Sequence, residues 1–291
     1  VIALAALMTA AAAFTGCSSE KKEEIAYVPP EVGRYENPIE IEGQWGASNA
    51  TGPDGQYGIG DPFVMRYNGK YYLYPSTSDP CDGIKVFESD DLVNWTYRGY
   101  AVSDSEATSH GAYAPEVVYY NGYFYLCQSR GGNGHYIYRS ESPTEGFELI
   151  STSARGEGDI DYGNIGLGID GSFYVSDDGK LYLLHTSRPQ ALNKTDHGRL
   201  RRQSLYARRY GLLGTANLDH WIEGPGIFRR GGFSYLTYTG NHVLSSGYRV
   251  AYSYAEDLTD LSSFIQPADN VTIIDTDAEH RGLGHASNFN G

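Results

Sequence analysis

Residues 60–73, GDPFVMRYNGKYYL, contain a turn dipeptide, Asn68-Gly69, that is followed at once by a run of aromatic residues. Asn-Gly supplies two residues that tolerate positive φ, which a tight two-residue hairpin turn requires. The run after the turn, Lys70 to Tyr74, is rich in residues that favour β-strands. This stretch therefore predicts a β-hairpin.

The same kind of turn recurs along the chain, with first-residue separations of 53, 57, 53 and 59. The further members are Asn121-Gly122, Asp178-Gly179, Gly231-Gly232 and Asn290-Gly291. A repeat of this length with strand-only content is typical of β-propeller blades, and no long stretch with a helical period follows residue 35. The repeat predicts an all-β fold, a five-bladed β-propeller whose fifth blade is truncated at Gly291.

The N-terminal residues predict targeting rather than folded structure. Residues 1–14 are small and apolar, and Phe14 to Cys17 resembles the end of a bacterial lipoprotein signal peptide, in which Cys17 is acylated. A cleaved secretory signal with an incidental cysteine is the alternative. We expect a partial signal peptide at residues 1–17, a tether at 18–34 and one catalytic propeller domain at 35–291. The expected location is extracytoplasmic, lipid-anchored at the bacterial cell envelope.

The charge of the chain limits its partners. With 36 acidic and 22 basic side chains, the net charge is −14. Nucleic acids and anionic surfaces would be repelled, whereas a neutral polysaccharide or oligosaccharide is compatible with this charge. We therefore expect no nucleic-acid partner, and a membrane only through the lipid anchor. Besides Cys17, only Cys81 and Cys127 are present, which gives neither a disulfide scaffold nor a zinc spacing.

Chemistry-bearing residues precede each turn at a similar phase of the repeat. Propeller blades begin near a common axis, so these residues are expected to converge on one pocket. Four of the five repeats offer a carboxylate there and the fifth a histidine: Asp61, Glu116, Asp170, Glu223 and His285. A ring of acids is costly to pack, so it indicates catalysis, a metal site or both.

At these residues the sequence resembles glycoside hydrolase family 43, five-bladed propellers that cleave pentose-containing polysaccharides such as arabinan and xylan. The similar segments are residues 60–73, 169–183, 222–228 and 282–285. The resemblance implies that Asp61 is the general base, Glu223 the general acid and Asp170 the residue that tunes the acid. It also implies that His285 lies near a metal, usually calcium, on the axis.

Residues 113–116, YAPE, depart from the Trp-Ala-Pro-Asp-like segment that the family often has at this point. Tyr113 lies beside the start of an axial strand, where an aromatic ring can stack on a sugar. We therefore predict Tyr113 and Glu116 as substrate-binding residues. Glu116 has a bland alternative, in which its carboxyl bridges two blades.

Inverting hydrolysis of a glycosidic bond needs one carboxylate to activate water and one protonated carboxyl to donate to the leaving oxygen, about 6.5 to 9.5 Å apart. The first and fourth repeats are not neighbours in a ring of five, so Asp61 and Glu223 can face each other across a sugar and a water. An ionised Asp170 nearby would keep Glu223 protonated.

Other readings remain open from the residues alone. Retaining fructan hydrolases and mannoside phosphorylases share the propeller architecture, but residues 60–63, GDPF, lack the Asn-Asp-Pro-Asn segment of the fructan enzymes. A surface-anchored glycan-binding propeller without catalysis is the alternative from another class, although the carboxylates are retained. The residues do not separate arabinosides from xylosides or exo from endo cleavage.

The lipid anchor can be tested with Cys17→Ser in a chain that carries its complete signal peptide. We expect the unmutated protein to fractionate with membranes and the variant to be soluble, because each buried CH₂ of an acyl chain contributes about 0.8 kcal/mol to membrane binding. Cell fractionation with immunodetection measures this. Recovery of the unmutated protein in the soluble fraction alone would contradict the anchor.

Overall fold

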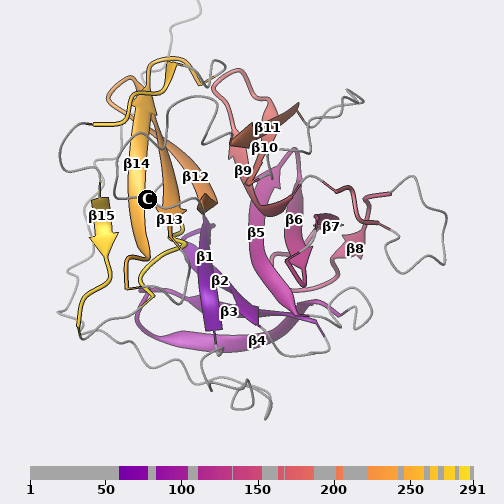
Figure 1. Cartoon of the computed structure of the whole chain (residues 1–291). Coiled ribbons are helices and arrows are strands. Elements are labelled where there is room, and N and C mark those ends of the chain that lie inside the picture. Colours follow the sequence, from indigo (N-terminus) through magenta and orange to yellow (C-terminus); the bar gives the residue numbers. More distant parts are fainter. Residues whose placement is uncertain are drawn as a thin grey trace, which may run out of the picture. The chain divides into compact units, whose positions relative to one another are not determined.

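The computed structural model describes most of residues 59–288 (Figure 1). The described ranges are 59–77, 83–103, 111–132, 134–152, 163–166, 168–186, 201–205, 222–241, 246–258, 263–267, 272–278 and 282–288. They contain fifteen β-strands and no α-helix, which confirms the predicted all-β class. Within these ranges there is accordingly no helix able to cross a membrane. The signal peptide, the tether and Cys81 lie outside the described residues.

The first sheet is formed by two consecutive antiparallel units. The first unit contains β1 (Ile59–Tyr67), β2 (Lys70–Thr77), β3 (Ile84–Ser89) and β4 (Trp95–Val102). The second contains β5 (Ala112–Tyr120), β6 (Tyr123–Arg130), β7 (Tyr136–Ser140) and β8 (Glu148–Leu149). A single pair, Thr77 with Ala112, joins β2 to β5. Each unit is therefore a meander of the kind that one propeller blade contains.

Two further sheets follow along the chain. One contains β9 (Ile169–Val175), β10 (Leu181–Thr186) and β11 (Arg201–Leu205), with β11 parallel to β10. The other is a four-stranded antiparallel meander of β12 (Ile222–Arg230), β13 (Phe233–Gly240), β14 (Arg249–Ala255) and β15 (Thr272–Asp275). The first strands of successive units contact one another, β1 with β5, β5 with β9 and β9 with β12.

A hairpin is confirmed at each of the four described turn dipeptides, but the one at Asp178-Gly179 has a five-residue loop, Ser176 to Lys180, in which Asp178 does not have positive φ. Four turns connect β1 to β2, β5 to β6, β9 to β10 and β12 to β13. Asn68 and Gly69 have φ of 50° and 79°, and Asn121 and Gly122 have 49° and 88°. Both positions of such a turn need positive φ, which explains the choice of Asn-Gly. The fifth dipeptide, Asn290-Gly291, lies outside the described residues.

The first strand of each unit carries a β-bulge, and a residue with positive φ lies in it. Pairing with the second strand shifts register between Gly60 and Phe63, between Tyr113 and Glu116, and between Glu223 and Gly226. The pairing of β9 with β10 shifts in the same way after Ile169. The residues in the bulges are Asp61, Ala114, Asp170 and Gly224, with φ of 44°, 45°, 56° and 56°. His285, in the segment 282–288, has φ of 48°.

Hydroxyl groups in the second strand of one unit bind the bulge of the next unit. The backbone N–H of Ala114 donates to Ser76 Oγ at 2.5 Å, and that of Asp170 donates to Ser129 Oγ at 3.0 Å. His285 N–H donates to Thr239 Oγ1 at 2.6 Å. Bulges are common next to active sites, where they re-aim a side chain. Here a hydroxyl of one unit holds the bulge of the next unit in place, and this kind of hydrogen bond recurs.

The core lies between the meanders. One buried cluster joins the first two meanders through large side chains such as Tyr74, Phe124 and Tyr138. Another joins β10 to the last sheet through Leu184, Leu236 and Tyr238. Cys127 is a buried free thiol whose S–H donates a hydrogen bond to Gly171 O at 3.0 Å. The core thus fixes neighbouring first strands against each other.

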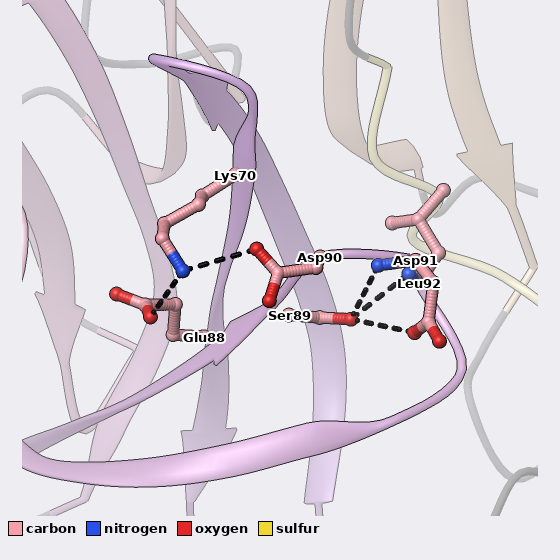
Figure 2. Close-up of polar contacts among 6 residues, drawn as sticks. All are labelled: Lys70, Glu88, Ser89, Asp90, Asp91 and Leu92. Carbon is pink, nitrogen blue, oxygen red and sulfur yellow. Dashed lines mark hydrogen bonds and ion pairs between the residues drawn. The ribbon is translucent and has the colours of Figure 1, made fainter. Parts of the chain in front are cut away.

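A polar turn after β3 is built around the buried hydroxyl of Ser89 (Figure 2). Ser89 Oγ accepts hydrogen bonds from Asp91 N at 3.1 Å and Leu92 N at 2.9 Å. It donates to Asp91 Oδ1 at 3.1 Å. Leu92 has a φ of 67°, which is unfavourable for a branched apolar residue. The hydroxyl of Ser89 therefore holds this turn together with the carboxylate of Asp91, which accepts the N–H groups of Val93 and Asn94.

Ser89→Ala removes the acceptor for two backbone N–H groups in this turn. We expect it to lower the free energy of unfolding by about 1 to 2 kcal/mol, because each such hydrogen bond contributes about 1 kcal/mol and its partners become unsatisfied. Chemical denaturation of the variant measures this, with Ser103→Ala, at an exposed serine after β4, as the matched control. Equal stability of the two variants would show that the turn does not depend on Ser89.

Candidate active site

Asp61 lies in the bulge of β1, and both of its carboxylate oxygens are bound. Ser76 Oγ donates to Oδ2 at 2.6 Å, and His285 Nδ1 lies 3.0 Å from Oδ1. The side chain is still 27% exposed, so a small molecule can reach it. Asp61 therefore has a fixed orientation together with access to solvent, which a general base needs.

Asp61 and His285 form an ion pair. Burial alone would raise the pKa of Asp61, but the charge and hydrogen bond of His285, with that of Ser76, lower it overall. Burial likewise works against a charged His285, yet Asp61, with Asp170 and Glu223 beyond it, raises the pKa of His285 to about 10. Both members are therefore charged at neutral pH. The histidine compensates part of the negative charge that the site concentrates.

Asp170 lies in the bulge of β9 and is almost fully buried, with 7% of its surface exposed. Its Oδ2 accepts a hydrogen bond from Gly224 N at 3.2 Å. Burial is the main reason that the pKa of Asp170 is raised to about 7; His285 opposes the shift, and the charges of Glu223 and Asp61 reinforce it. The carboxyl of Asp170 is thus close to Asp61 and Glu223, the other two predicted catalytic residues.

Glu223 is the second residue of β12 and directly precedes Gly224, whose N–H is bound to Asp170. Its side chain is half-buried, and Oε1 accepts a hydrogen bond from the phenol of Tyr248. The charge of Glu223 contributes to the pKa shifts of Asp170 and His285. The structure therefore brings Asp61, Asp170 and Glu223 together with His285 at one site.

The expectation of one carboxylate at the same phase of four repeats is wrong in detail. The bulge positions of the second and fourth repeats hold Ala114 and Gly224, neither of which has a carboxylate. Glu223 lies one residue before its bulge position and Glu116 two residues after, so their side chains approach the site from neighbouring positions. Spacing to the turn identifies the bulge positions, because Asp61, Ala114 and Gly224 each lie seven residues before the first residue of their turn. Glu116 and Glu223 lie five and eight residues before theirs, so this spacing already marks them as out of phase.

Glu116 reaches from β5 to β9 and is half-buried. Its Oε2 accepts a hydrogen bond from Phe173 N at 3.1 Å. Burial raises the pKa of Glu116 to about 8, although Ser172 and Phe173 donate hydrogen bonds that favour its charged form. This carboxyl therefore bridges two units, as the alternative reading had it. Its contact with substrate, like that of Tyr113, which is half-buried just before Ala114, stays a prediction.

The described side chains do not by themselves form a calcium site. Within the described ranges, no group of three or more His, Cys, Asp or Glu side chains is arranged to hold a metal ion. His285 contacts Asp61 through Nδ1 at 3.0 Å. The described residues do not test the expected calcium near His285, which stays a prediction.

Tyr248 and Ser76 are site residues that sequence analysis missed. Tyr248 donates to Glu223 and Ser76 to Asp61. Tyr248 is one of 26 tyrosines, and nothing in its local sequence distinguishes it from those that fill the core. Ser76 had a usable signal, because a hydroxyl residue recurs eight positions after the first residue of each described turn, as Ser129, Thr186 and Thr239 do.

Comparison with known proteins gives related enzymes. A xylan 1,3-beta-xylosidase of Vibrio sp is 32% identical over 139 residues, which cover 43% of this chain and 24% of that protein. A xylosidase/arabinosidase of Butyrivibrio fibrisolvens is 25% identical over 197 residues, covering 60% and 36%. These matches therefore span only about a quarter to a third of the curated relatives' length.

Solved structures agree with these relatives. The crystal structure of an endo-1,4-beta-xylanase from Bacteroides thetaiotaomicron is similar with a TM-score of 0.57 and 28% identity, and covers 79% of each chain. The sequence profile described as Glycosyl hydrolases family 43 matches residues 54–291, a range that includes every member of the site. Since that range is more than half of the chain, the resemblance is confirmed: this chain belongs to glycosyl hydrolases family 43.

Proposed function

We propose that this protein is an inverting glycoside hydrolase that cleaves pentose-containing polysaccharides or oligosaccharides of the xylan or arabinan type. In this proposal Asp61 is the general base, Glu223 the general acid and Asp170 the residue that tunes and orients the acid. The observation that carries it is the convergence of three carboxylates from β1, β9 and β12 with one charged histidine. Two carboxyl groups with different roles are what glycoside hydrolysis needs.

The environment of Asp61 suits a general base. Its lowered pKa keeps it ionised at neutral pH, and Ser76 and His285 fix its orientation. In the reaction, a water held by Asp61 attacks the anomeric carbon and gives its proton to the carboxylate. The glycosidic C–O bond breaks as Glu223 gives its proton to the leaving oxygen. Asp61 ends protonated and Glu223 ionised, and exchange of protons with solvent restores both.

Asp170 acts on Glu223 by charge and through the backbone. Its carboxylate accepts the N–H of Gly224, the residue after Glu223, so it orients the peptide that carries the acid. Asp170 and Glu223 repel each other when both are ionised, because like charges in one site oppose each other. Burial is the main cause that raises the pKa of Asp170 to about 7, and the negative charges of Glu223 and Asp61 add to it.

For the fold we propose five blades, with residues 282–288 as the first strand of the fifth. This segment is bound on one side to the fourth unit, where His285 N donates to Thr239 Oγ1. On the other side Ser287 Oγ accepts a hydrogen bond from Val64 N of β1 at 3.0 Å. Its bulge residue, His285, repeats the backbone conformation of Asp61. A fifth first strand between β12 and β1 accounts for these contacts.

The substrate and the location belong to the same proposal. Relatives named xylosidase and arabinosidase favour a pentoside, and the net charge of −14 suits a neutral glycan. Cys17 and the apolar stretch before it support an extracytoplasmic enzyme that is lipid-anchored in the cell envelope. Such a location places the enzyme where polymeric glycans are available.

Glu223→Ala tests the assignment of the acid. We expect cleavage of a natural oligosaccharide, whose alkoxide leaving group needs a proton, to slow by about 10² to 10⁴-fold, the usual worth of general acid catalysis. A dinitrophenyl glycoside of the same sugar departs without a proton and should lose far less. Steady-state kinetics on the two substrates measure this. Equal losses on both would refute the assignment.

Asp61→Ala provides the contrasting result. Both kinds of substrate still need an activated water, so we expect a loss of about 10² to 10⁴-fold with the oligosaccharide and with the dinitrophenyl glycoside alike. The anomeric configuration of the first product, followed by NMR with the unmutated enzyme, gives an independent check. A product with retained configuration would contradict the role of Asp61 as base.

A further inference from the structure

Tyr248 lies directly before β14, and only 2% of its surface is exposed. Its phenol donates a hydrogen bond to Oε1 of Glu223. We propose that Tyr248 is a positioning residue of this enzyme, which directs the acid proton of Glu223 to Oε2, where it faces the leaving oxygen. This inference rests on the proposed role of Glu223 as the general acid.

The phenol acts as a donor throughout the reaction. Burial raises the pKa of Tyr248 far above its usual range, and the carboxylates of Glu223, Asp61 and Asp170 raise it further. Tyr248 therefore keeps its proton at any pH at which the protein works. In a protonated carboxyl the carbonyl oxygen is a better hydrogen-bond acceptor than the hydroxyl oxygen, so a hydrogen bond to Oε1 favours the acid proton on Oε2.

The proton transfer then balances within Glu223 and the substrate. The bond between Oε2 and its proton breaks, and a bond forms between that proton and the leaving oxygen, which keeps the electron pair of the glycosidic bond. Glu223 becomes a carboxylate, and the hydrogen bond from Tyr248 becomes charge-assisted and stronger. Tyr248 thus fixes the acid before the transfer and stabilises the carboxylate after it.

The backbone of Tyr248 is hydrogen-bonded, through Thr276, to a later segment of the same chain. Thr276 Oγ1 donates to Tyr248 O at 2.7 Å. The same hydroxyl accepts the N–H of Leu283 at 3.2 Å, so one threonine links Tyr248 to the segment 282–288. Tyr248 is therefore fixed at its backbone by the segment that carries His285.

The ring of Tyr248 is confined by Gly284. A Cβ at Gly284 would lie 2.1 Å from Cε1 of Tyr248 and 2.6 Å from Cγ2 of Thr239, so only glycine fits at this position. A ring enclosed in this way has little rotational freedom, and its hydroxyl has a fixed direction. Such confinement is what a positioning group in an active site requires.

Tyr248→Phe tests this inference, because it removes the hydroxyl and keeps the ring that fills the space beside Gly284. We expect kcat for the oligosaccharide to fall about 10- to 100-fold, the typical worth of a hydrogen bond to a charged group. The dinitrophenyl glycoside should change by less than about 3-fold, and KM should change little for either substrate, because binding is not affected. Equal losses on the two substrates would overturn the inference.

Tyr238→Phe is the matched control in the same sheet. Tyr238 is 1% exposed, and its hydroxyl contacts Ser253 Oγ at 3.2 Å and Gln266 Nε2 at 2.7 Å. The substitution Tyr238→Phe removes one buried phenol hydroxyl, as Tyr248→Phe does, and so we expect it to have a comparable effect on packing and stability. We expect any loss of activity in this variant to be the same on both substrates.

A double-mutant cycle separates positioning from a general structural effect. With the oligosaccharide, Tyr248→Phe should cost nothing further in the Glu223→Ala background, because the group that it positions is gone. A full additional loss in that background would overturn the inference while leaving the acid role of Glu223 intact. Conversely, if Glu223→Ala alone fails to distinguish the two substrates, the proposed function itself is wrong.

Discussion

The site depends on a left-handed backbone residue inside a β-bulge, repeated in the first strand of every unit. Asp61 and Asp170 have positive φ there, and His285, in the segment 282–288, has a similar φ; this conformation is unfavourable for residues other than glycine. The conformation is maintained from outside, by hydroxyl groups such as Ser129 and Thr239 that accept the N–H of the next unit's bulge. Because the N–H groups of Ala114, Asp170 and Gly224 are each bound by a residue of the preceding unit, the side chains at the site cannot be arranged by one unit alone.

The second constraint is electrostatic. Asp61, Asp170 and Glu223 concentrate negative charge in one place, which opposes folding unless it is neutralised or distributed. The structure does both: His285 compensates Asp61 with a positive charge, and the pKa of Asp170 rises to about 7. Glu223 instead receives a hydrogen bond from Tyr248. Three similar carboxyl groups thus acquire three different environments, which different roles in one reaction require.

How much could be predicted from the sequence follows from how local each feature is. The tight hairpins were predictable because Asn68-Gly69, Asn121-Gly122 and Gly231-Gly232 supply positive φ within the turn itself. The repeat then located Asp61, Asp170 and Glu223, since equivalent positions of successive units lie near each other. The prediction of one common phase was wrong, because the bulge positions of the second and fourth repeats hold Ala114 and Gly224, and the carboxyl groups of these repeats lie at nearby residues instead.

The sequence by itself determined the all-β class, the hairpin positions and the identity of the carboxyl groups. Turn sterics and strand propensity are properties of neighbouring residues, and the repeat can be read directly from the spacing of the turns. Only the tertiary structure decided which partner each carboxyl has: His285 and Ser76 for Asp61, the N–H of Gly224 for Asp170, and Tyr248 for Glu223. Those partners come from other strands and other units. Their hydrogen bonds and charges set protonation and orientation, and these depend on distances that exist only when the sheets pack together.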